Sequence, residues 1–473
     1  MANDYDLVIL GGGIGGYTAA IRAAQEGLTT AIVEKDKLGG TCLHKGCIPS
    51  KSLLRSAEVF SEVKDSSKYG ISVKDPSIDF GAVQDRKEAI VNDLYTGVQH
   101  LMNKRKIDVY QGLGRILGPS IFSPSAGTIS VENNDGSENE LLVPKNVIIA
   151  TGSRPRILQG LEPDGKTVLT SDEALNMEEL PSSMIIIGGG VIGVEWASLL
   201  SDFGVDVTVV ESASQLLPHE EAEIARELTK RLKERGVQVL TDAKVMPEKT
   251  GRSDSLSLAI NQKGEEKTIQ AEKVLLSVGR EAIVDDIGLD NTNITLTNGA
   301  IAVNDVYQTQ ESHIYAVGDV IGGMQLAHVA AKEGIIAVEH MCGLDPAPLS
   351  YTSVPKCTYS RPEVASIGLT EAEAKEQGYT IKTGSFSFRA NGKALVHGDG
   401  SGFVKFIANE ENDDLLGIHM IGPQVTELIS EAALAKLVDA SNFEMSEIIH
   451  PHPALSEVLG EGALAVEGKA IHS

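Results

Sequence analysis

One pattern of apolar and polar positions occurs twice along the chain. Residues 8–34 read VILGGGIGGYTAAIRAAQEGLTTAIVE, and residues 185–211 read IIIGGGVIGVEWASLLSDFGVDVTVVE. Each copy has an apolar run, a glycine-rich turn, a helical stretch, a further glycine and an apolar run ending in Glu. The offset between the copies is constant, at 185 − 8 = 177 residues. Each copy therefore predicts a β-α-β unit that opens a doubly wound sheet.

The turn of each copy has the G-x-G-x-x-G spacing of a dinucleotide site. In such a turn the first glycine permits the tight bend, the second lets a pyrophosphate approach, and the third allows the helix to pack on the strand. The helix N-terminus then offers unpaired N–H groups to the phosphates. The glycines in question are Gly11, Gly13 and Gly16 in the first copy, and Gly188, Gly190 and Gly193 in the second.

A glutamate closes each copy. Glu34 and Glu211 both follow the first glycine of their turn by 23 residues (34 − 11 and 211 − 188). A carboxylate at this place can accept hydrogen bonds from ribose hydroxyls. At Glu211 it would also repel a 2′-phosphate, and no Arg occurs in residues 209–213. The second copy is therefore expected to bind NAD rather than NADP.

Other strand-to-glycine patterns suggest the domain organisation. Buried strands that reach a glycine turn are expected at residues 147–153, 274–280 and 314–319, and the composition changes near residue 350. We predict an α/β protein with two Rossmann-like domains, the first interrupted by the second, and a C-terminal α+β domain. The expected boundaries are 1–152 and 281–349 for the interrupted domain, 153–280 for the inserted one and 350–473 for the last.

Composition narrows the classes of function. Lys and Arg number 41 and Asp and Glu 66, so the formal charge is −25, which disfavours nucleic acid and anionic membranes as partners. No apolar run approaches the ~18 residues of a membrane span, and no secretory signal is visible. We expect a cytoplasmic protein; the mitochondrial matrix or the plastid stroma also fits if a transit peptide was removed. No metal site is expected.

Two of the four cysteines are close together, in GGTCLHKGCIPSK at residues 39–51. Cys42 and Cys47 would lie ~140° apart on a regular helix, so a disulfide requires a distorted turn, which Gly46 and Pro49 would permit. A short loop gains little stability from a disulfide, so reversible redox exchange is the more natural use. Lys45 and Lys51 are expected to lower the thiol pKa values. Two reduced, buried cysteines are the alternative.

These motifs together resemble the pyridine nucleotide–disulfide oxidoreductases. The cysteine segment, the double fingerprint, AVGD at residues 316–319 and HPHPALSE at residues 450–457 extend the likeness through nearly the whole chain. Within the family the chain most resembles the branch that oxidises protein-bound dihydrolipoamide in 2-oxoacid dehydrogenase complexes and the glycine cleavage system. The resemblance implies FAD at the first fingerprint and NAD at the second.

The resemblance also implies roles for single residues. Cys42 would exchange with the substrate, Cys47 would lie against the flavin, and Lys51 would sit near the flavin N5, paired with Glu195. FAD binding is expected from Gly11, Gly13, Gly16, Glu34, Lys51, Gly114, Gly152, Asp319 and Ala327. NAD binding is expected from Gly188, Gly190, Gly193, Glu211, Val245 and Gly279.

The segment at residues 450–457 offers a proton acceptor. Oxidising a dithiol requires removal of a proton from a thiol whose reference pKa is ~8.5, which a His can do near neutral pH. A carboxylate five residues later can orient and stabilise the imidazolium. By resemblance His452 is the base and Glu457 its partner, and both reach the active site of a second subunit, which implies a homodimer. His450 is a second candidate.

Several other functions remain open at this point. Glutathione-reductase-like members prefer NADP, against which Glu211 argues, and mercuric-reductase-like members need a C-terminal cysteine pair, which residues 468–473 lack. A soluble transhydrogenase would lack one redox cysteine. A non-catalytic flavoprotein assembly subunit would be expected to lose Cys42, Cys47, His452 or Glu457, and all four are present.

Overall fold

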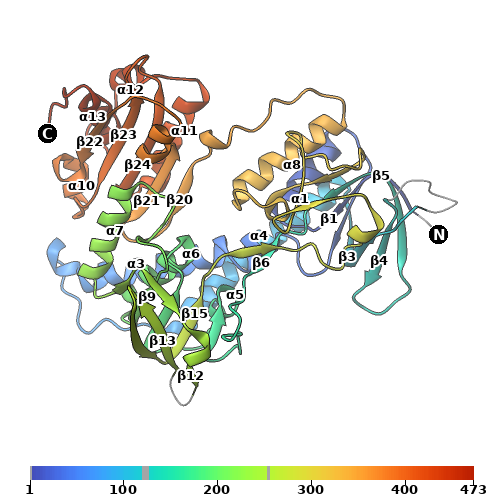
Figure 1. Cartoon of the computed structure of the whole chain (residues 1–473), viewed down its shortest axis with the longest axis horizontal. Helices are drawn as coiled ribbons and strands as arrows, with labels where there is room; N and C mark the ends of the chain where they lie inside the picture. The colour runs from blue at the N-terminus through green and yellow to red at the C-terminus, as the bar shows by residue number, and fades with distance from the viewer. Residues whose placement is uncertain (1–2, 120–126, 253–255, 473) are drawn as a thin grey trace. The chain divides into compact units, whose positions relative to one another are not determined.

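The computed structural model describes residues 3–119, 127–252 and 256–472 (Figure 1). The chain divides into two compact units, each built from three segments. The first unit comprises residues 1–52, 84–156 and 279–349, and the second comprises residues 53–83, 157–278 and 350–473. Each repeated motif forms the centre of one of these units.

A six-stranded sheet forms the centre of the first unit. Its parallel part has the order β3, β2, β1, β5, β19, and β4 joins β3 and β5 in antiparallel pairing. The strands are β1 (Asn3–Leu10), β2 (Thr30–Glu34), β3 (Asp108–Ile116), β4 (Ile129–Asn133), β5 (Glu140–Ile149) and β19 (Ile314–Ala316). The first motif thus supplies the central strand β1 and its neighbour β2.

Both faces of this sheet are buried. Leu7 and Ile9 of β1 pack into the cluster that contains α1 (Ile14–Gln25) and α8 (Ala327–Met341), whereas Val8 and Leu10 pack into a cluster on the opposite face. Figure 1 shows α1 and α8 side by side near β1. A strand buried on both faces explains the uninterrupted apolar run that begins the first motif.

The first unit also contains shorter elements. These are α2 (Gly40–His44), β6 (Ser153–Pro155), β16 (Arg280–Ala282), η3 (Leu289–Asn291), β17 (Leu296–Thr297), β18 (Ala300–Ile301) and η4 (Gly318–Ile321). Two long helices, α3 (Cys47–Lys64) and α4 (Phe80–Arg105), each have one end in the first unit and the other in the second.

The second motif repeats this arrangement in the second unit. Five parallel strands have the order β10 (Gln238–Leu240), β9 (Asp206–Val210), β8 (Ser183–Ile187), β15 (Lys273–Leu276) and β7 (Val168–Thr170). The helices α6 (Val191–Phe203) and α7 (Ala222–Glu234) follow β8 and β9. Met184 and Ile186 of β8 enter one core cluster, and Ile185 and Ile187 enter another.

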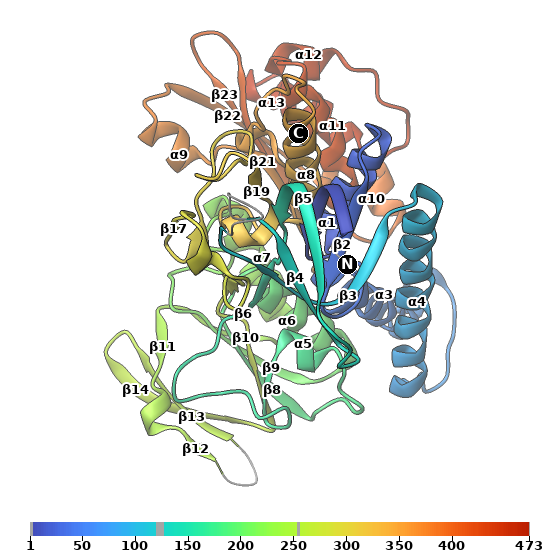
Figure 2. The ribbon, with the colours of Figure 1, turned by 90° about the vertical axis from the view of Figure 1, so that its right-hand side faces the viewer.

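A small antiparallel sheet is inserted after β10. It consists of β11 (Ala243–Val245), β12 (Gly251–Arg252), β13 (Leu256–Gln262) and β14 (Glu265–Ala271), and Figure 2 shows β13 and β14 as a long hairpin. The remaining short elements of this part are η1 (Ser66–Tyr69), α5 (Ser171–Ala174) and η2 (Pro247–Lys249).

The C-terminal part of the second unit is an antiparallel sheet with helices. The strand order is β20 (Lys356–Thr358), β21 (Glu363–Gly368), β24 (Leu415–Gly422), β23 (Phe403–Asn409) and β22 (Ile381–Ser387). The helices α11 (Val425–Leu437), α12 (Asn442–Glu447) and α13 (Glu457–Val466) share its core, and η5 (Tyr351–Ser353), α9 (Glu371–Glu376), η6 (Phe388–Ala390) and α10 (Gly392–Val396) complete it.

The predicted α/β class, with two Rossmann-like sheets and a C-terminal α+β part, is confirmed. The exact domain boundaries remain a prediction. Among the described residues no helix combines the length and the apolar character that crossing a bilayer requires.

Candidate active site

The first glycine-rich turn has no room for side chains at its ends. Gly11 has a φ of +103°, and a Cβ placed there would lie 2.3 Å from the carbonyl oxygen of Ala150. A Cβ at Gly16 would lie 2.0 Å from the carbonyl oxygen of Gly11. At Gly13, by contrast, a Cβ would meet nothing within 4 Å. The turn is therefore tightly packed at its first and third glycines and open at the second, where a pyrophosphate would approach.

The second turn reproduces this geometry. Gly188 has a φ of +105°, and its Cβ would lie 2.3 Å from the carbonyl oxygen of Ser277. A Cβ at Gly193 would lie 1.9 Å from the carbonyl oxygen of Gly188, and one at Gly190 would again meet nothing within 4 Å. Both turns thus have the shape that their spacing predicts.

The terminal glutamate of each motif is hydrogen-bonded to its own turn. Glu34 Oε2 accepts a hydrogen bond from the Gly12 N–H at 2.7 Å, and its Oε1 accepts one from the Asp36 N–H at 2.7 Å. Glu211 Oε2 accepts from the Gly189 N–H at 2.6 Å, and its Oε1 from the Ala213 N–H at 2.6 Å. Because a carboxylate oxygen has two lone pairs, each glutamate can still accept a further hydrogen bond from a ribose.

The cysteine pair lies at an interruption between two helices. α2 ends at His44 and α3 begins at Cys47, so the two cysteines are not on one continuous helix. Gly40, the first residue of α2, packs against the first turn: a Cβ there would lie 2.7 Å from Gly13 Cα. This close backbone contact brings the helix that carries Cys42 directly beside the first dinucleotide turn.

The pKa of the Cys42 thiol is higher than its basic neighbours alone would predict. Its pKa is raised, first by a hydrogen bond with the Cys47 side chain and then by burial, and the positive charge of Lys51 offsets only part of this. Lys45 forms an ion pair with Asp36 at 2.9 Å. Lys51 thus lowers this pKa, as expected, but the net shift of the Cys42 pKa is upward. The hydrogen bond shows that the two thiols face each other across the interruption.

A polar cluster in the first unit surrounds the expected flavin-binding aspartate. The Ser153 hydroxyl donates a hydrogen bond to Asp319, Arg280 Nε donates to Ser153 Oγ at 2.7 Å, and Arg280 lies 4.0 Å from the Asp319 carboxylate. Glu333 of α8 accepts a hydrogen bond from the Gly318 N–H at 2.7 Å. These contacts fix the turn after β19. The sequence reasoning missed Ser153, Arg280 and Glu333; the Gly-Ser and Gly-Arg pairs after β5 and β15 were the available signal.

The other predicted cofactor residues lie at strand ends, helix starts or close contacts. Gly152 (φ +73°) follows β5, Gly279 (φ +105°) follows β15, Val245 ends β11 and Ala327 begins α8. A Cβ at Gly114 of β3 would lie 2.6 Å from Leu10 Cδ2. Their contacts to cofactors remain predictions.

Lys51 and Glu195 belong to different units, and their pairing remains a prediction. Within the second unit, Glu195 is a buried residue of α6, and its Oε1 accepts a hydrogen bond from the Tyr359 N–H at 3.0 Å. The carboxylate is thus held from the C-terminal part of the same unit.

The expected base and its partner form a hydrogen bond. His452 Nδ1 lies 2.8 Å from Glu457 Oε1, and Glu457 Oε2 accepts from the Ala454 N–H at 2.9 Å. Partial burial opposes ionisation of Glu457, but these two hydrogen bonds lower its pKa overall. The His452 side chain is 80% exposed in the single chain, whereas the His450 side chain is 8% exposed and hydrogen-bonded to Glu431 at 2.8 Å. This geometry favours His452 over His450 as the residue that meets a substrate.

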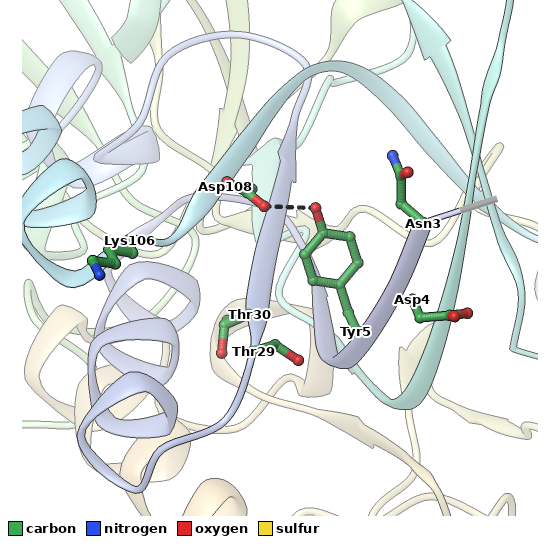
Figure 3. Close-up of a pocket in the computed structure, with 7 residues that line it drawn as sticks. All are labelled: Asn3, Asp4, Tyr5, Thr29, Thr30, Lys106 and Asp108. Carbon is green, nitrogen blue, oxygen red and sulfur yellow. Dashed lines mark hydrogen bonds between the residues drawn. The ribbon is translucent and has the colours of Figure 1, made fainter. Parts of the chain in front are cut away.

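A polar pocket in the first unit is separate from the dinucleotide turn (Figure 3). Its volume is about 500 Å³. It is lined by Asn3, Asp4, Tyr5, Thr29, Thr30, Lys106 and Asp108. These residues lie at the beginning of β1, β2 and β3, whereas Gly11 follows the end of β1. In a parallel sheet of this kind ligands bind at the carboxyl ends of the strands, so the pocket is not the active site.

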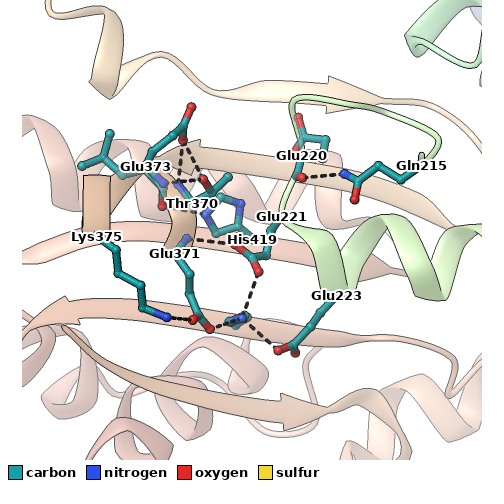
Figure 4. Close-up of polar contacts among 11 residues, drawn as sticks. Gln215, Glu220, Glu221, Glu223, Thr370, Glu371, Glu373, Lys375 and His419 are labelled. Carbon is teal, nitrogen blue, oxygen red and sulfur yellow. Dashed lines mark hydrogen bonds and ion pairs between the residues drawn. The ribbon is translucent and has the colours of Figure 1, made fainter. Parts of the chain in front are cut away.

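Three carboxylates of the second unit, Glu221, Glu223 and Glu371, lie close together (Figure 4). Lys405 of β23 is 2% exposed, and its Nζ lies 3.1 Å from Glu221, 3.0 Å from Glu223 and 2.5 Å from Glu371. The ammonium group occupies the place that a metal ion would take among these oxygens. The cluster is therefore a structural tie between α7, α9 and β23.

Comparison with known protein families shows to which family the chain belongs. The family description "Pyridine nucleotide-disulphide oxidoreductase" matches residues 5–334, and the dimerisation domain of the same family matches residues 354–463. The chain belongs to the pyridine nucleotide-disulphide oxidoreductases. This membership confirms the predicted resemblance and the predicted oxidoreductase activity, and the dimerisation domain supports a homodimer.

Several members of this family are similar over the full length. A dihydrolipoyl dehydrogenase of Bacillus subtilis is 62% identical over 473 residues, covering 100% of both chains, and one of Zymomonas mobilis is 42% identical with the same coverage. Among solved structures, LpdA of Mycobacterium tuberculosis has a TM-score of 0.89 at 27% identity, covering 98% of this chain and 99% of its own. A HOCl-induced flavoprotein disulfide reductase of Escherichia coli has a TM-score of 0.85 at 26% identity, with coverage of 98% and 99%.

Proposed function

We propose that this family member oxidises protein-bound dihydrolipoamide to lipoamide and reduces NAD⁺ to NADH, using FAD and the Cys42–Cys47 pair. The observation that carries the proposal is the packing of Gly40 on Gly13, which places the redox pair beside the first dinucleotide turn. The 62% identity to a dihydrolipoyl dehydrogenase over the full length supports the choice of substrate. Lipoyl domains of 2-oxoacid dehydrogenase complexes, or the lipoyl carrier of the glycine cleavage system, are the proposed partners.

The residues present fit both dinucleotides. Gly13 and Gly190 leave open space at the N-termini of α1 and α6, where backbone N–H groups and the helix dipole favour a pyrophosphate. Glu34 and Glu211 are held at the ends of β2 and β9, where a ribose would lie. Bound FAD would carry the electron pair from the dithiol to NAD⁺.

In the proposed reaction, His452 and the two cysteines carry out different steps of the thiol–disulfide exchange. His452, oriented by Glu457, takes the proton from one thiol of dihydrolipoamide. The thiolate attacks Cys42 of the disulfide, forming a mixed disulfide and releasing Cys47 as a thiolate. The second substrate thiol attacks the substrate sulfur bound to Cys42 and gives its proton to the Cys42 sulfur as that sulfur leaves. This step gives lipoamide and leaves the pair as the Cys42 thiol and the Cys47 thiolate. Two electrons have thus passed from substrate to protein.

The dimer is part of this proposal because His452 is to act in the site of the other subunit. The C-terminal part of the second unit exposes several large apolar side chains, including Leu434, Leu437, Val438, Phe443 and Ile449. Single exposed apolar residues are ordinary, but such a group on α11, on α12 and just after each of them is typical of an interface. We propose that these side chains are covered by the second copy. A cytoplasmic location also belongs to the proposal, since a catalytic dithiol needs a reducing compartment.

The activity is tested with free dihydrolipoamide and with NAD⁺ or NADP⁺. The wild type should reduce NAD⁺ and strongly prefer it, while Cys47→Ser should keep its FAD and lose the lipoamide reaction. Undiminished turnover in Cys47→Ser would exclude the disulfide mechanism. Reduction of glutathione disulfide or mercuric ion in place of lipoamide would move the protein to another branch of the family.

The shared site is tested by mixing two inactive variants. In a heterodimer of Cys47→Ser and His452→Gln chains, one site combines an intact cysteine pair with an intact His452 from the other chain. Unfolding and refolding the mixture should therefore restore activity that neither variant shows alone. If activity stays absent although heterodimers form, the site is built from one chain.

A further inference from the structure

The segment just before β21 contacts one face of α6. Glu195, Ser198 and Asp202 are three and then four residues apart, so they lie along a single helix face. The Tyr359 N–H donates to Glu195 Oε1 at 3.0 Å, and the Arg361 N–H donates to Ser198 Oγ at 2.9 Å. The Arg361 guanidinium donates to both Asp202 oxygens, at 2.5 and 3.3 Å.

A second arginine closes this cluster from the end of α7. Arg235 donates to Ser198 Oγ at 3.2 Å and to the Ser198 carbonyl at 3.0 Å, and its Nη2 lies 2.7 Å from Asp202 Oδ1. It also donates to the carbonyl oxygen of Arg361 at 2.5 Å. Planar guanidinium groups that bind a carboxylate in this way fix its geometry as well as its charge. The segment at residues 359–361 is therefore held to α6 at both its backbone and its side chain.

The segment at residues 359–361 also binds the Glu195 carboxylate. β20 ends at Thr358 and β21 begins at Glu363, so the Tyr359 N–H lies outside the sheet ladder and is available to Glu195. Glu195 is 5% exposed, and burying a carboxylate costs free energy unless it is hydrogen-bonded. It also lies on the same helix whose N-terminus forms the second dinucleotide turn.

We propose that Tyr359, Arg361, Asp202, Ser198 and Arg235 form a positioning clamp, which holds the Glu195 carboxylate in one orientation and thereby sets the rate of hydride transfer between the flavin and the nicotinamide. The clamp rests on the proposed function and on the family resemblance, which implies that Glu195 pairs with Lys51 near the flavin N5. Its members are positioning residues, because they act through Glu195.

The clamp is tested by removing Arg361. Arg361→Ala leaves Asp202 paired with Arg235, so no buried charge is abandoned. The rate at which NADH bleaches the flavin should fall on the order of tenfold to a hundredfold, as for a catalytic group displaced by about 1 Å. Arg361→Lys keeps the charge without the planar fork and should lie between Arg361→Ala and the wild type. Arg231→Ala, which removes an arginine whose ion pairs among the described residues lie within α7, should match the wild type.

A double variant separates positioning from general damage. If Arg361 acts through Glu195, then Arg361→Ala should slow the reaction no further in a Glu195→Gln background. An equal, additive loss in both backgrounds, or no loss in either, would overturn the proposal. If Arg361→Ala does not fold, Ser198→Ala, which removes the acceptor of the Arg361 N–H without altering a charge, takes its place in the same cycle.

A second readout does not depend on turnover. In the apoprotein, hydrogen exchange of the Tyr359 amide should accelerate in Arg361→Ala while the strands of the second dinucleotide sheet stay protected; unchanged exchange at Tyr359 would contradict the clamp. Flavin reduction by NADH requires no lipoyl substrate. A wild type that fails to oxidise dihydrolipoamide but shows the clamp effect would therefore refute only the substrate assignment.

Discussion

The two dinucleotide motifs have nearly the same backbone geometry and hydrogen bonds. Their first glycines differ by 2° in φ (+103° and +105°), and both approach a carbonyl oxygen at the end of a neighbouring strand. Each turn is tied to its terminal glutamate by a backbone N–H. Even the loop after the second strand returns to the same atom of the turn: the Gly39 N–H donates to the Gly12 carbonyl, and the Leu217 N–H donates to the Gly189 carbonyl, both at 2.8 Å.

The motifs differ in the segment that comes after this loop. In the first, Gly39 and Gly40 both have positive φ, and Gly40 lies against Gly13, so the chain turns at once into the helix that carries Cys42. In the second, the chain continues to Glu221 and α7, which are tied to the C-terminal sheet through Lys405. A common dinucleotide scaffold is thus followed by the cysteine pair in one copy and by an attachment to the C-terminal sheet in the other. The turn alone does not determine the function of its domain.

The largest expected effect is obtained by filling the third glycine of either turn. Gly16→Ala and Gly193→Ala each place a Cβ about 2 Å from a carbonyl oxygen (2.0 and 1.9 Å), which the backbone can relieve only by moving the helix. We expect a destabilisation of about 4 kcal/mol or more in each case. Gly16→Ala should lose FAD, whereas Gly193→Ala should keep FAD and lose NAD⁺ binding, as measured by flavin absorbance and NAD⁺ titration. Loss of FAD from Gly193→Ala would show that the copies are not independent.

The next largest effect on stability is expected at Lys405, whose ion pairs attach the second motif to the C-terminal sheet. Lys405→Met leaves Glu221, Glu223 and Glu371 without their shared ammonium group, and removing one partner of a buried ion pair costs about 3–5 kcal/mol. Urea denaturation should show this loss. Lys375→Met, which removes an exposed partner of Glu371, is the control and should cost less than about 1 kcal/mol. Equal effects would mean that the buried cluster contributes no more than a surface pair.

A smaller effect should separate the two terminal glutamates. Glu211→Gln removes the charge that repels a 2′-phosphate and weakens the bonds to the Gly189 and Ala213 N–H groups. Since a hydrogen bond to a charged group is worth about 1.5–3 kcal/mol, we expect the KM for NAD⁺ to rise at least about tenfold and the preference over NADP⁺ to shrink. Glu34→Gln should weaken FAD retention and leave the NAD⁺ to NADP⁺ ratio unchanged. A changed ratio in Glu34→Gln would reverse the assignment of the two sites.

The smallest effect on stability is expected at Asp6, which lies in β1 just before the first motif. A hydrogen bond from Lys145, together with those from Thr29, lowers the pKa of Asp6 from 3.8 to about 2. A depressed pKa stabilises the fold above the unfolded value, and this contribution is lost as the pH falls towards about 2. Asp6→Asn should therefore cost less than about 1 kcal/mol at neutral pH and progressively less as the pH falls through about 2. The difference in unfolding free energy between the two proteins should shrink on acidification; a constant difference would exclude the linkage.

The sequence predicted the features that depend on local pattern. The repeated spacing predicted both glycine turns and the buried strands, and the family resemblance predicted the roles of Cys42, Cys47 and His452. It did not predict that the pKa of Cys42 is raised, because the dominant partner, Cys47, becomes its hydrogen-bond partner only through the interruption between α2 and α3.

The contacts missed from the sequence join segments far apart in the chain. Arg361 meets Asp202 from 159 residues away, and Lys405 meets Glu221 from 184 residues away, so no local pattern specifies either partner. One signal was available for the first: Glu195, Ser198 and Asp202 form a polar line on a helix whose other residues, apart from Ser201, are apolar, and such a line requires polar partners if the helix is buried.

Glu34 and Glu211 have a thermodynamic consequence for ligand capture. Each carboxylate binds N–H groups of its own loop through contacts within the chain, so the conformational entropy of ordering that loop is lost during folding. Calorimetry of NAD⁺ uptake should therefore register little of the entropy penalty that ordering a flexible loop would add to binding.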